Sequence, residues 1–404
     1  MVNFSRDDRP DRCAWGCTAM LNASPLATAW RRVKPHVLVF DTQLSVILAL
    51  LATLSLVTLY SAGYDFPGRF EGQVRNFVAA FLMMWILANV PPQTLMRFAV
   101  PLYTTGIALL IAVAVTGTIK KGARRWLEIG PMQVQPSELL KIGVPLMLAW
   151  YFHKHATRVR GRDFISAAIL LAIPVGLIAK QPDLGTALLV LAAGIYVIYF
   201  AGLSWKLIAP VLVVAAIAAG ALIAVGDRIC APDVAWPGMH DYQKQRICTL
   251  LDPTTDPLGR GFHTIQSAIA VGSGGLTGKG YMQGTQTHLD FIPERTTDFI
   301  LAVYAEEFGL VGIVLLLILY TALIVRGLVI AANAPTYFSR LLAGSITLIF
   351  FTYAFVNMGM VSGILPVVGV PLPFMSYGGT ALATLGIGAG ILMSVERHKK
   401  LVQT

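Results

Sequence analysis

Charged residues are scarce in this sequence. Asp, Glu, Lys and Arg make up 13% of its 404 residues, whereas hydrophobic residues make up 56%. Soluble proteins contain about 25% charged residues, so the composition excludes a typical soluble domain and indicates a polytopic membrane protein. The formal net charge of +10 would suggest nucleic-acid binding in a soluble chain. Here the Lys and Arg that collect in cytoplasmic loops explain it better.

Cysteine is rare as well, with four residues in the chain. Cys13 and Cys17 lie in the N-terminal segment without a set of further metal ligands, which argues against a zinc site. Cys230 and Cys248 fall in one long loop that we expect outside the cytoplasm. A disulfide between them is compatible with that location, but the sequence does not require it.

The N-terminal segment lacks the compact apolar core and the cleavage site of a secretory signal. It contains prolines and basic residues, and we expect residues 1–40 to form a cytoplasmic extension. No internal repeat is visible, whereas many transporters are built from repeated halves with broken helices at the membrane midplane. The polar residues concentrate instead at one membrane face.

Apolar runs suited to membrane helices fill most of the remaining chain. A membrane span needs roughly 20 apolar residues. The sequence predicts an all-α membrane domain over residues 41–398, with a large loop at 226–298 between the seventh and eighth helices and a short tail at 399–404. The ten candidate spans are 43–62, 73–91, 97–117, 138–153, 164–180, 184–202, 205–225, 299–325, 341–363 and 377–395.

The basic residues between the spans set the expected orientation. The N-terminal extension, the loop 154–162, the loop 326–340 and the end 397–400 contain most of them and fall on one side of a ten-span chain. That side is expected to be the cytoplasm. Both termini then lie inside, and the loop 226–298 lies outside.

One basic loop maps to the outer side of this topology. It contains Lys120, Lys121, Arg124 and Arg125, followed by Trp126. It is either a tolerated interfacial cluster with Trp126 as an aromatic anchor, or a site that binds an anion. We favour the anion site, because outward cations oppose the orientation rule and are costly to insert.

Ionisable residues also mark the starts of two predicted helices. Ser137 is a candidate N-cap, and Glu138 and Lys141 are three residues apart, so they share a helix face. They form either a simple ion pair or a site in which Lys141 faces a diphosphate about one turn below the surface. Asp183 either caps the following helix or shapes the rim of a cavity.

The loop 226–298 is too long and too rich in glycine for a plain connector. Gln243 and Arg246 are three residues apart and can reach one ligand, unless Arg246 is only a solvated charge. The apolar Ile265 and Ile269 predict a short amphipathic helix that lies on the membrane.

The loop ends in Asp298, directly before an apolar helix. Asp298 either caps that helix or acts as a general base at the membrane surface. Glu306 and Glu307 lie deeper and are more typical of pairing within the bundle. The prolines and glycines of residues 367–380 predict irregular backbone that lines a cavity, with Ser376 as a candidate cap of the last helix.

Several ordered motifs resemble the SEDS family (shape, elongation, division and sporulation) over about residues 40–400. They are Gly-Ala-Arg-Arg-Trp, Gln-Pro-Ser-Glu, Gln-Pro-Asp-Leu-Gly-Thr, Phe-Ile-Pro-Glu-Arg-Thr-Thr-Asp-Phe and Pro-Leu-Pro-Phe-Met-Ser-Tyr-Gly-Gly. The resemblance implies ten helices in the bacterial inner membrane and an inverting glycosyltransferase. This enzyme would polymerise lipid II into β-1,4 glycan strands on the outer face during cell elongation and shape maintenance.

The resemblance also implies site residues. Asp298 matches the family's essential aspartate, Lys141 the lysine after Gln-Pro-Ser-Glu, and Trp126 the tryptophan of the first motif. Gln243 and Arg246 match a Tyr-Gln-x-x-Arg pair. The departures are Thr296 where relatives often have His, Gln133 where they often have Arg, and Asp290 for a frequent Glu; Arg124, Arg125 or Lys141 would then have to hold the diphosphate.

The implied partners are lipid II, a class B penicillin-binding protein with transpeptidase activity, and elongation-complex proteins such as MreC and MreD, with no nucleic acid. The chemistry needs a base and cations for the leaving diphosphate, with or without a divalent cation (Mg²⁺ or Mn²⁺). Other hypotheses are a lipid II flippase, a membrane scaffold for the partner, and septal synthesis by a division member of the family.

Overall fold

The computed structural model describes residues 40–120, 123–129, 132–156, 160–231, 234, 241–255, 261–289, 291–292 and 294–399. The N-terminal extension with Cys13 and Cys17, and the last five residues of the tail, lie outside this part of the chain. The bundle contains the long helices α2 (Thr42–Ala62), α3 (Arg69–Asn89), α4 (Pro92–Thr116), α5 (Pro136–Lys154), α6 (Gly161–Lys180), α7 (Leu184–Phe200), α8 (Trp205–Ile229), α12 (Ile300–Ala332), α13 (Tyr337–Val361) and α14 (Gly379–Lys399).

Each predicted span coincides with one of these helices. Seven of them, α2, α4, α6, α8, α12, α13 and α14, are long and apolar enough to cross a membrane, and α7 is apolar but shorter. The helices α3 and α5 carry more ionisable residues, among them Arg69, Glu71 and Lys141. The protein is therefore a multi-pass membrane protein, while the count of ten crossings stays a prediction.

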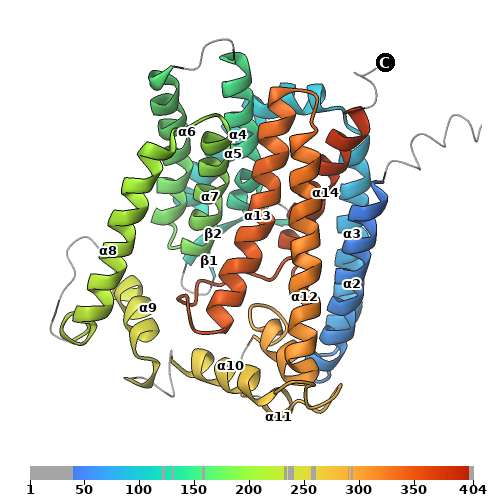
Figure 1. Ribbon diagram of the computed structural model, residues 1–404, viewed down its shortest axis with the longest axis vertical. Helices are drawn as coiled ribbons and strands as arrows, with labels where there is room; N and C mark the ends of the chain where they lie inside the picture. The colour runs from blue at the N-terminus through green and yellow to red at the C-terminus, as the bar shows by residue number, and fades with distance from the viewer. Residues whose placement is uncertain are drawn as a thin grey trace, which may run out of the picture.

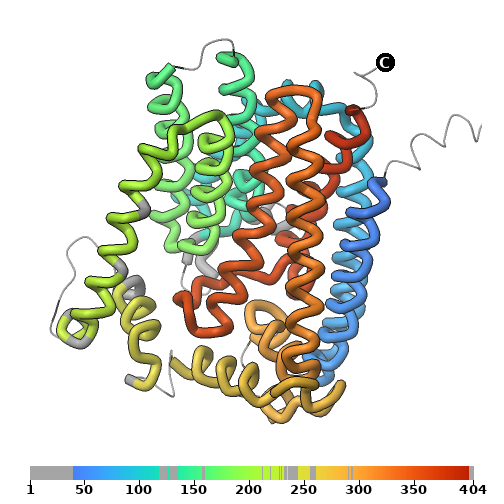
Figure 2. Tube along the Cα trace, in the orientation of Figure 1, coloured from blue at the N-terminus to red at the C-terminus, as the bar shows by residue number. Residues whose placement is uncertain are grey.

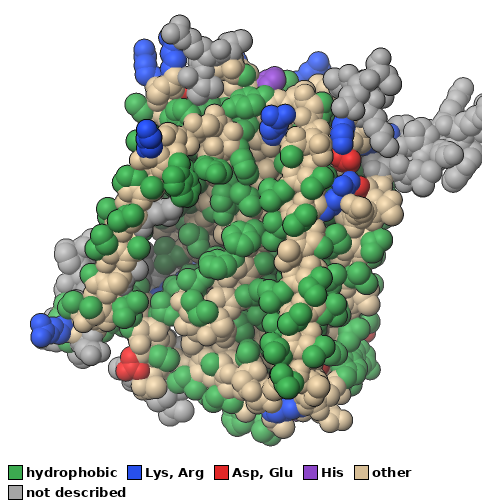
Figure 3. Space-filling view, in the orientation of Figure 1, with side chains coloured by type: hydrophobic (Ala, Val, Ile, Leu, Met, Phe, Trp, Pro, Cys, Tyr) green, Lys and Arg blue, Asp and Glu red, His purple; other side chains and the backbone are tan. Residues whose placement is uncertain are grey.

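The helix α13 lies at the centre of the bundle, where it packs against α5, α7 and α12 (Figure 1). In the most apolar 18-residue stretch of α13, 78% of the residues are buried inside the protein, whereas 0% are buried in the corresponding stretch of α8. Hydrophobic side chains cover most of the face seen in Figure 3, and Lys and Arg on this face gather mainly at the end where α5 meets α6 and α12 meets α13. The predicted orientation places this end in the cytoplasm and stays a prediction.

A small antiparallel sheet interrupts the helical pattern, so the expectation of an all-α fold was incomplete. The strands β1 (Thr118–Lys120), β2 (Ala123–Ile129) and β3 (Met132–Val134) pair in the order β1-β2-β3. The register pairs Ile119 with Arg124 and Glu128 with Gln133. Strand β2 also packs against α4 and α5. Backbone groups near a membrane need internal hydrogen-bond partners, and strand pairing supplies them here.

The described part of the long polar loop folds at one end of the bundle, opposite the end where Lys and Arg gather at the α5–α6 and α12–α13 connections (Figures 1 and 3). It forms α9 (Asp241–Leu251), a 3-10 turn (Pro253–Thr255), α10 (Gly261–Ser273) and α11 (Thr285–His288). Figure 2 shows this path running across the end of the bundle and into α12. A disulfide joins Cys230 at the end of α8 to Cys248 on α9, which decides the alternative that the sequence left open.

The helix α12, which matches the predicted span 299–325, is broken at Gly309. Gly309 has φ 61° and ψ −159°, a backbone region that is essentially restricted to glycine. The segment 274–280 fills the gap: Lys279 N–H donates to the carbonyl of Glu306 (3.0 Å), and Leu310 N–H donates to the carbonyl of Gly275 (2.9 Å). The break therefore leaves its backbone groups paired.

We predict that Gly309→Ala lowers the free energy of unfolding by about 2 kcal/mol or more, because alanine strains this backbone region and its Cβ would overlap the backbone of Gly278. Gly272→Ala on α10 is the control, because a Cβ there meets nothing within 4 Å. Thermal unfolding of the purified proteins in detergent measures both. Equal stability of the two variants would contradict this account of the break.

Candidate active site

The segment Thr296–Asp298, just before α12, is fixed by donors from a distant part of the chain. Its three successive carbonyl oxygens accept hydrogen bonds from the backbone N–H of Tyr377 (2.9 Å), the hydroxyl of Ser376 (2.6 Å) and the side-chain amide of Asn357 (2.8 Å). Asn357 is fully buried, and its amide also donates to the carbonyl of Val370 (2.8 Å). One side chain thus joins Asp298 to the loop after α13.

The carboxylate of Asp298 lies beside that loop and is partly exposed. A Cβ atom at Gly369 would lie 3.4 Å from its Oδ2 atom, and Gly369 has φ 72°. The N-cap of α12 is Phe299, with no side-chain cap, so the interpretation of Asp298 as a helix cap was wrong. Ser376 was also predicted to be a cap, but it bonds to Leu372 and Thr297 instead.

The predicted amphipathic helix exists as α10, and it packs against α12 and α13. Its Ser267 donates to the carbonyl of Val361 (3.0 Å). Its His263 stacks on Phe299, with ring centroids 5.7 Å apart. Burial lowers the pKa of His263, although the charge of Glu294 acts in the opposite direction, so the ring next to Asp298 is neutral at pH 7.

Lys141 is buried on α5 and has two partners. Its Nζ atom lies 2.6 Å from Oε1 of Glu138 and 2.7 Å from the hydroxyl of Tyr353. The other oxygen of Glu138 accepts from the hydroxyl of Thr384 (3.2 Å). The ion pair that the spacing suggested is therefore present. Ser137 does not cap α5, because the N-cap is Gln135 and the helix starts at Pro136.

A second polar cluster surrounds Asp183, which caps α7 by accepting from the N–H of Thr186 (3.3 Å). The guanidinium of Arg125 lies 3.8 Å from its Oδ1 atom, and Gln135 donates to its Oδ2 atom (3.0 Å). Arg125 also donates to the carbonyls of Gln181 and Pro182. The structure thus brings together two predicted residues, Arg125 and Asp183.

Two connections join these clusters to Asp298. Tyr353 and Asn357 are four residues apart on α13 and therefore share a face; Tyr353 contacts Lys141, and Asn357 holds Asp298. The loop after α13 makes the second connection, because a Cβ at Gly185 would lie 2.7 Å from the carbonyl of Val368, next to Gly369. Sequence reasoning missed Tyr353 and Asn357, which lie as single polar residues in an apolar helix.

The remaining predicted residues are only partly described. Trp126 lies on β2, half-buried, and Arg246 lies on α9, which packs against α8. The side chains of Lys120, Arg124 and Gln243, and Lys121 altogether, are outside the described part. Among the described residues, no group of three or more His, Cys, Asp or Glu side chains is placed to hold a metal ion.

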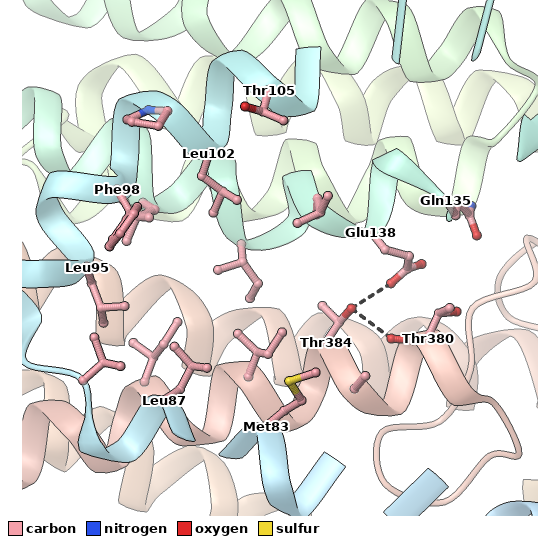
Figure 4. Close-up of a pocket in the computed structure, with 18 residues that line it drawn as sticks. Met83, Leu87, Leu95, Phe98, Leu102, Thr105, Gln135, Glu138, Thr380 and Thr384 are labelled. Atoms are coloured by element: carbon pink, nitrogen blue, oxygen red, sulfur yellow. Dashed lines mark hydrogen bonds between the residues drawn. The ribbon is translucent and has the colours of Figure 1, made fainter. Parts of the chain in front are cut away.

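A cavity of about 810 Å³ extends from this polar region between α3, α4, α5 and α14. Figure 4 shows that one end is polar, with Glu138, Thr380 and Thr384 close together and Gln135 nearby. The rest of the wall is apolar and includes Met83, Leu87, Leu95, Phe98 and Leu102. The cavity therefore suits a long apolar chain with a polar head.

Comparison with known proteins gives a consistent result. The model of the FtsW/RodA/SpoVE family, described as a cell cycle protein, matches residues 41–401. The peptidoglycan glycosyltransferase MrdB of Escherichia coli (strain K12) is 49% identical over 361 residues, which cover 89% of this chain and 94% of MrdB. The stage V sporulation protein E of Bacillus subtilis (strain 168) is 34% identical and covers 89% of this chain and 98% of its own length.

Solved structures agree with this assignment. A chain from a peptidoglycan synthase complex, studied for the coordination of polymerization and crosslinking, has a TM-score of 0.72 at 34% identity and covers 90% of this chain and 99% of that chain. The rod shape determining protein RodA of Thermus thermophilus has a TM-score of 0.65 at 29% identity, with the same coverage. Sequence, fold and motifs agree: this chain belongs to the FtsW/RodA/SpoVE family of cell cycle proteins.

Proposed function

We propose that this protein joins lipid II units into β-1,4 glycan strands on the outer face of the bacterial inner membrane during elongation, with Asp298 as the general base. The protein is a peptidoglycan glycosyltransferase of the rod-shape type, as its relatives' names indicate. The observation that supports the mechanism best is the clamped segment Thr296–Asp298. Asn357 on α13 holds the segment that carries the Asp298 carboxylate. Tyr353 on the same helix contacts Lys141, and the loop after α13 contacts the start of α7, where Arg125 lies near Asp183.

The reaction needs one base and a site for the leaving group. A sugar hydroxyl attacks C1 of a muramyl unit and undecaprenyl diphosphate leaves, so an α linkage becomes β in one displacement. Asp298 accepts the hydroxyl proton. The diphosphate leaves with the bonding electron pair and needs cations rather than a second acid. Arg125 and Lys141 supply N–H donors to the diphosphate, and Lys120, Lys121, Arg124 and Arg246 are predicted to supply the net positive charge.

The cavity between α3, α4, α5 and α14 supports a lipid-linked substrate. Its apolar wall fits a polyprenyl tail, and its polar end at Gln135 and Glu138 touches both polar clusters. A tail in the cavity would place the diphosphate beside Lys141 and Arg125 without removing the lipid from the bilayer.

The expected partner is a class B penicillin-binding protein, because a solved relative is part of a peptidoglycan synthase complex. Elongation-complex proteins such as MreC and MreD are further proposed partners. We place both termini in the cytoplasm, in agreement with the Lys and Arg that gather at the end of the bundle where α5 meets α6 and α12 meets α13 (Figure 3).

Asp298→Asn is expected to keep the fold and to slow polymerisation of lipid II by about 100- to 10,000-fold, the usual contribution of a general base. Asp252→Asn, in the same loop, removes a carboxylate that caps a turn at Thr254 and should keep most activity. Glycan polymer is measured with purified protein, partner and lipid II. Polymer made by Asp298→Asn at the wild-type rate excludes the base role, and lipid translocation without polymer by the wild type would favour a flippase.

Lys141 needs a test that separates charge from stability. Lys141→Met alone leaves Glu138 without its counter-ion, which costs about 3–5 kcal/mol for a buried pair. The double variant with Glu138→Gln removes both charges. We expect it to unfold near the wild-type temperature but to need a higher lipid II concentration for half-maximal rate. Unchanged turnover of the double variant across lipid II concentrations would refute a role of Lys141 in substrate binding.

Asn357 is expected to position Asp298 through its amide. In Asn357→Asp a carboxylate faces two carbonyl oxygens and cannot donate, so kcat should fall by about tenfold or more while KM changes little. Activity relative to wild type should recover partly as the pH falls, because the protonated carboxyl donates again. The control is Asn333→Asp, which also removes an amide donor to a carbonyl (Val329, 2.9 Å) but lies at the other end of α12. A purely structural role would lower the melting temperature without this pH dependence.

A further inference from the structure

A second polar pocket lies on the other side of the Asp298 segment. It has a volume of about 370 Å³ and is formed by the α2–α3 connection, Ile292 and residues 294–296, with Asp65, Arg69, Glu294 and Arg295 on its wall. None of its residues was singled out as a substrate-binding residue from the sequence. Its size is near the lower end for ligand sites, so it fits a head group rather than a lipid tail.

Arg69, the first residue of α3, is the notable side chain of this pocket. Its guanidinium lies between two aromatic rings, 4.9 Å from the centre of Phe66 and 5.0 Å from the centre of Tyr377. Within the described chain its one hydrogen bond goes to the hydroxyl of Thr296 (2.6 Å). A guanidinium has five N–H donors, so the contacts with the two rings and with Thr296 leave most of these donors open to a ligand.

The neighbouring Arg295 has a different role. It is buried, donates to the carbonyl of Ala62 (2.8 Å) and forms an ion pair with Asp65. Burial is the largest single influence on the pKa of the Asp65 carboxyl and raises it. The hydrogen bonds from Arg295 and the backbone, together with the charges of Arg295 and His288, outweigh burial and lower this pKa, so the pair stays charged at pH 7. Glu294 is exposed and accepts from the hydroxyl of Thr297 (3.0 Å). The charge of Arg295 is thus balanced by Asp65, and Arg69 provides the open donors.

Arg69 and Arg125 lie at opposite ends of one path of contacts through Asp298. On one side, Arg69 bonds to Thr296, two residues before Asp298. On the other side, the carboxylate of Asp298 adjoins Gly369. The carbonyl of the neighbouring Val368 lies close to Gly185 at the start of α7. Asp183, which caps this helix, lies near Arg125. The base therefore lies between two separate places for anionic groups.

We infer that the Arg69 pocket binds an anionic group, a phosphate or a carboxylate, of the second lipid-linked substrate, while the Arg125–Lys141 region binds the diphosphate of the first. This inference rests on the proposed function, because polymerisation joins two molecules that each carry a diphosphate and a peptide. The planar fork of arginine binds phosphate and carboxylate oxygens in pairs. Both substrates are then anchored on opposite sides of the base that activates the attacking hydroxyl.

The test counts bound lipid II and, separately, bound undecaprenyl diphosphate on the full-length protein by native mass spectrometry over a range of lipid concentrations. Wild type should bind two molecules of lipid II and Arg69→Gln one; Gln is chosen because its amide can still bond to Thr296. Arg75→Gln is the control, since it removes an exposed charge from the same helix outside the pocket. In polymerisation assays Arg69→Gln should raise KM for lipid II by about tenfold, with kcat retained.

A second arm distinguishes the anionic groups. If the pocket takes the diphosphate, undecaprenyl diphosphate and lipid II both show the Arg69-dependent second molecule. If it takes a peptide carboxylate, lipid II alone shows it. Two molecules of each lipid bound to a folded Arg69→Gln protein, or occupation of the pocket by phosphatidylglycerol instead, would overturn the inference. Asp298→Asn should bind two molecules and make no polymer, so polymer from that variant would count against the proposed function alone.

Discussion

The position of Asp298 depends on hydrogen bonds whose donors lie about sixty residues or more further along the chain. The first part of α12, residues 300–308, is shorter than the roughly 12 residues that an isolated helix needs in water. It cannot orient the preceding residues by itself. The donors of Asn357, Ser376 and Tyr377 hold the three carbonyls before it, so packing of α13 and the following loop defines where the carboxylate lies.

The other end of this half-helix is fixed by a buried carboxylate. Glu306 accepts from Nζ of Lys279 (2.7 Å) and from the backbone N–H of Gln286 (2.9 Å). These bonds hold the segment 274–289 against α12, and the same segment pairs with the backbone at Gly309. A glycine break in a membrane helix is tolerated when neighbouring groups satisfy the freed backbone. The segment 274–289 thus supports the half-helix that follows Asp298.

The sequence predicted the parts of the fold that depend on local pattern. Apolar length located the helices, and the spacing of Glu138 and Lys141 gave their ion pair. The sheet was missed because two of its strands have only three residues each, and the third, β2, contains Arg124 and Arg125. Tyr353 and Asn357 were missed because a single polar residue in an apolar helix does not reveal which distant group it meets. Arg69 was missed because the two aromatic rings that contact it, Phe66 and Tyr377, come from opposite ends of the chain.

Charge balance limits how a diphosphate can bind beside α13. Lys141 is paired with Glu138, and Arg125 lies near Asp183, so these four groups have no net charge. The ammonium of Lys141 has three N–H donors, and Glu138 and Tyr353 take two of them in the described structure. The third can meet a phosphate oxygen without breaking the ion pair, but it adds little net attraction. In the proposed mechanism the remaining charge comes from Lys120, Lys121, Arg124 and Arg246 or from a divalent cation. In the proposed orientation, this requirement gives the basic loop at Lys120–Arg125 a physical reason to face outward.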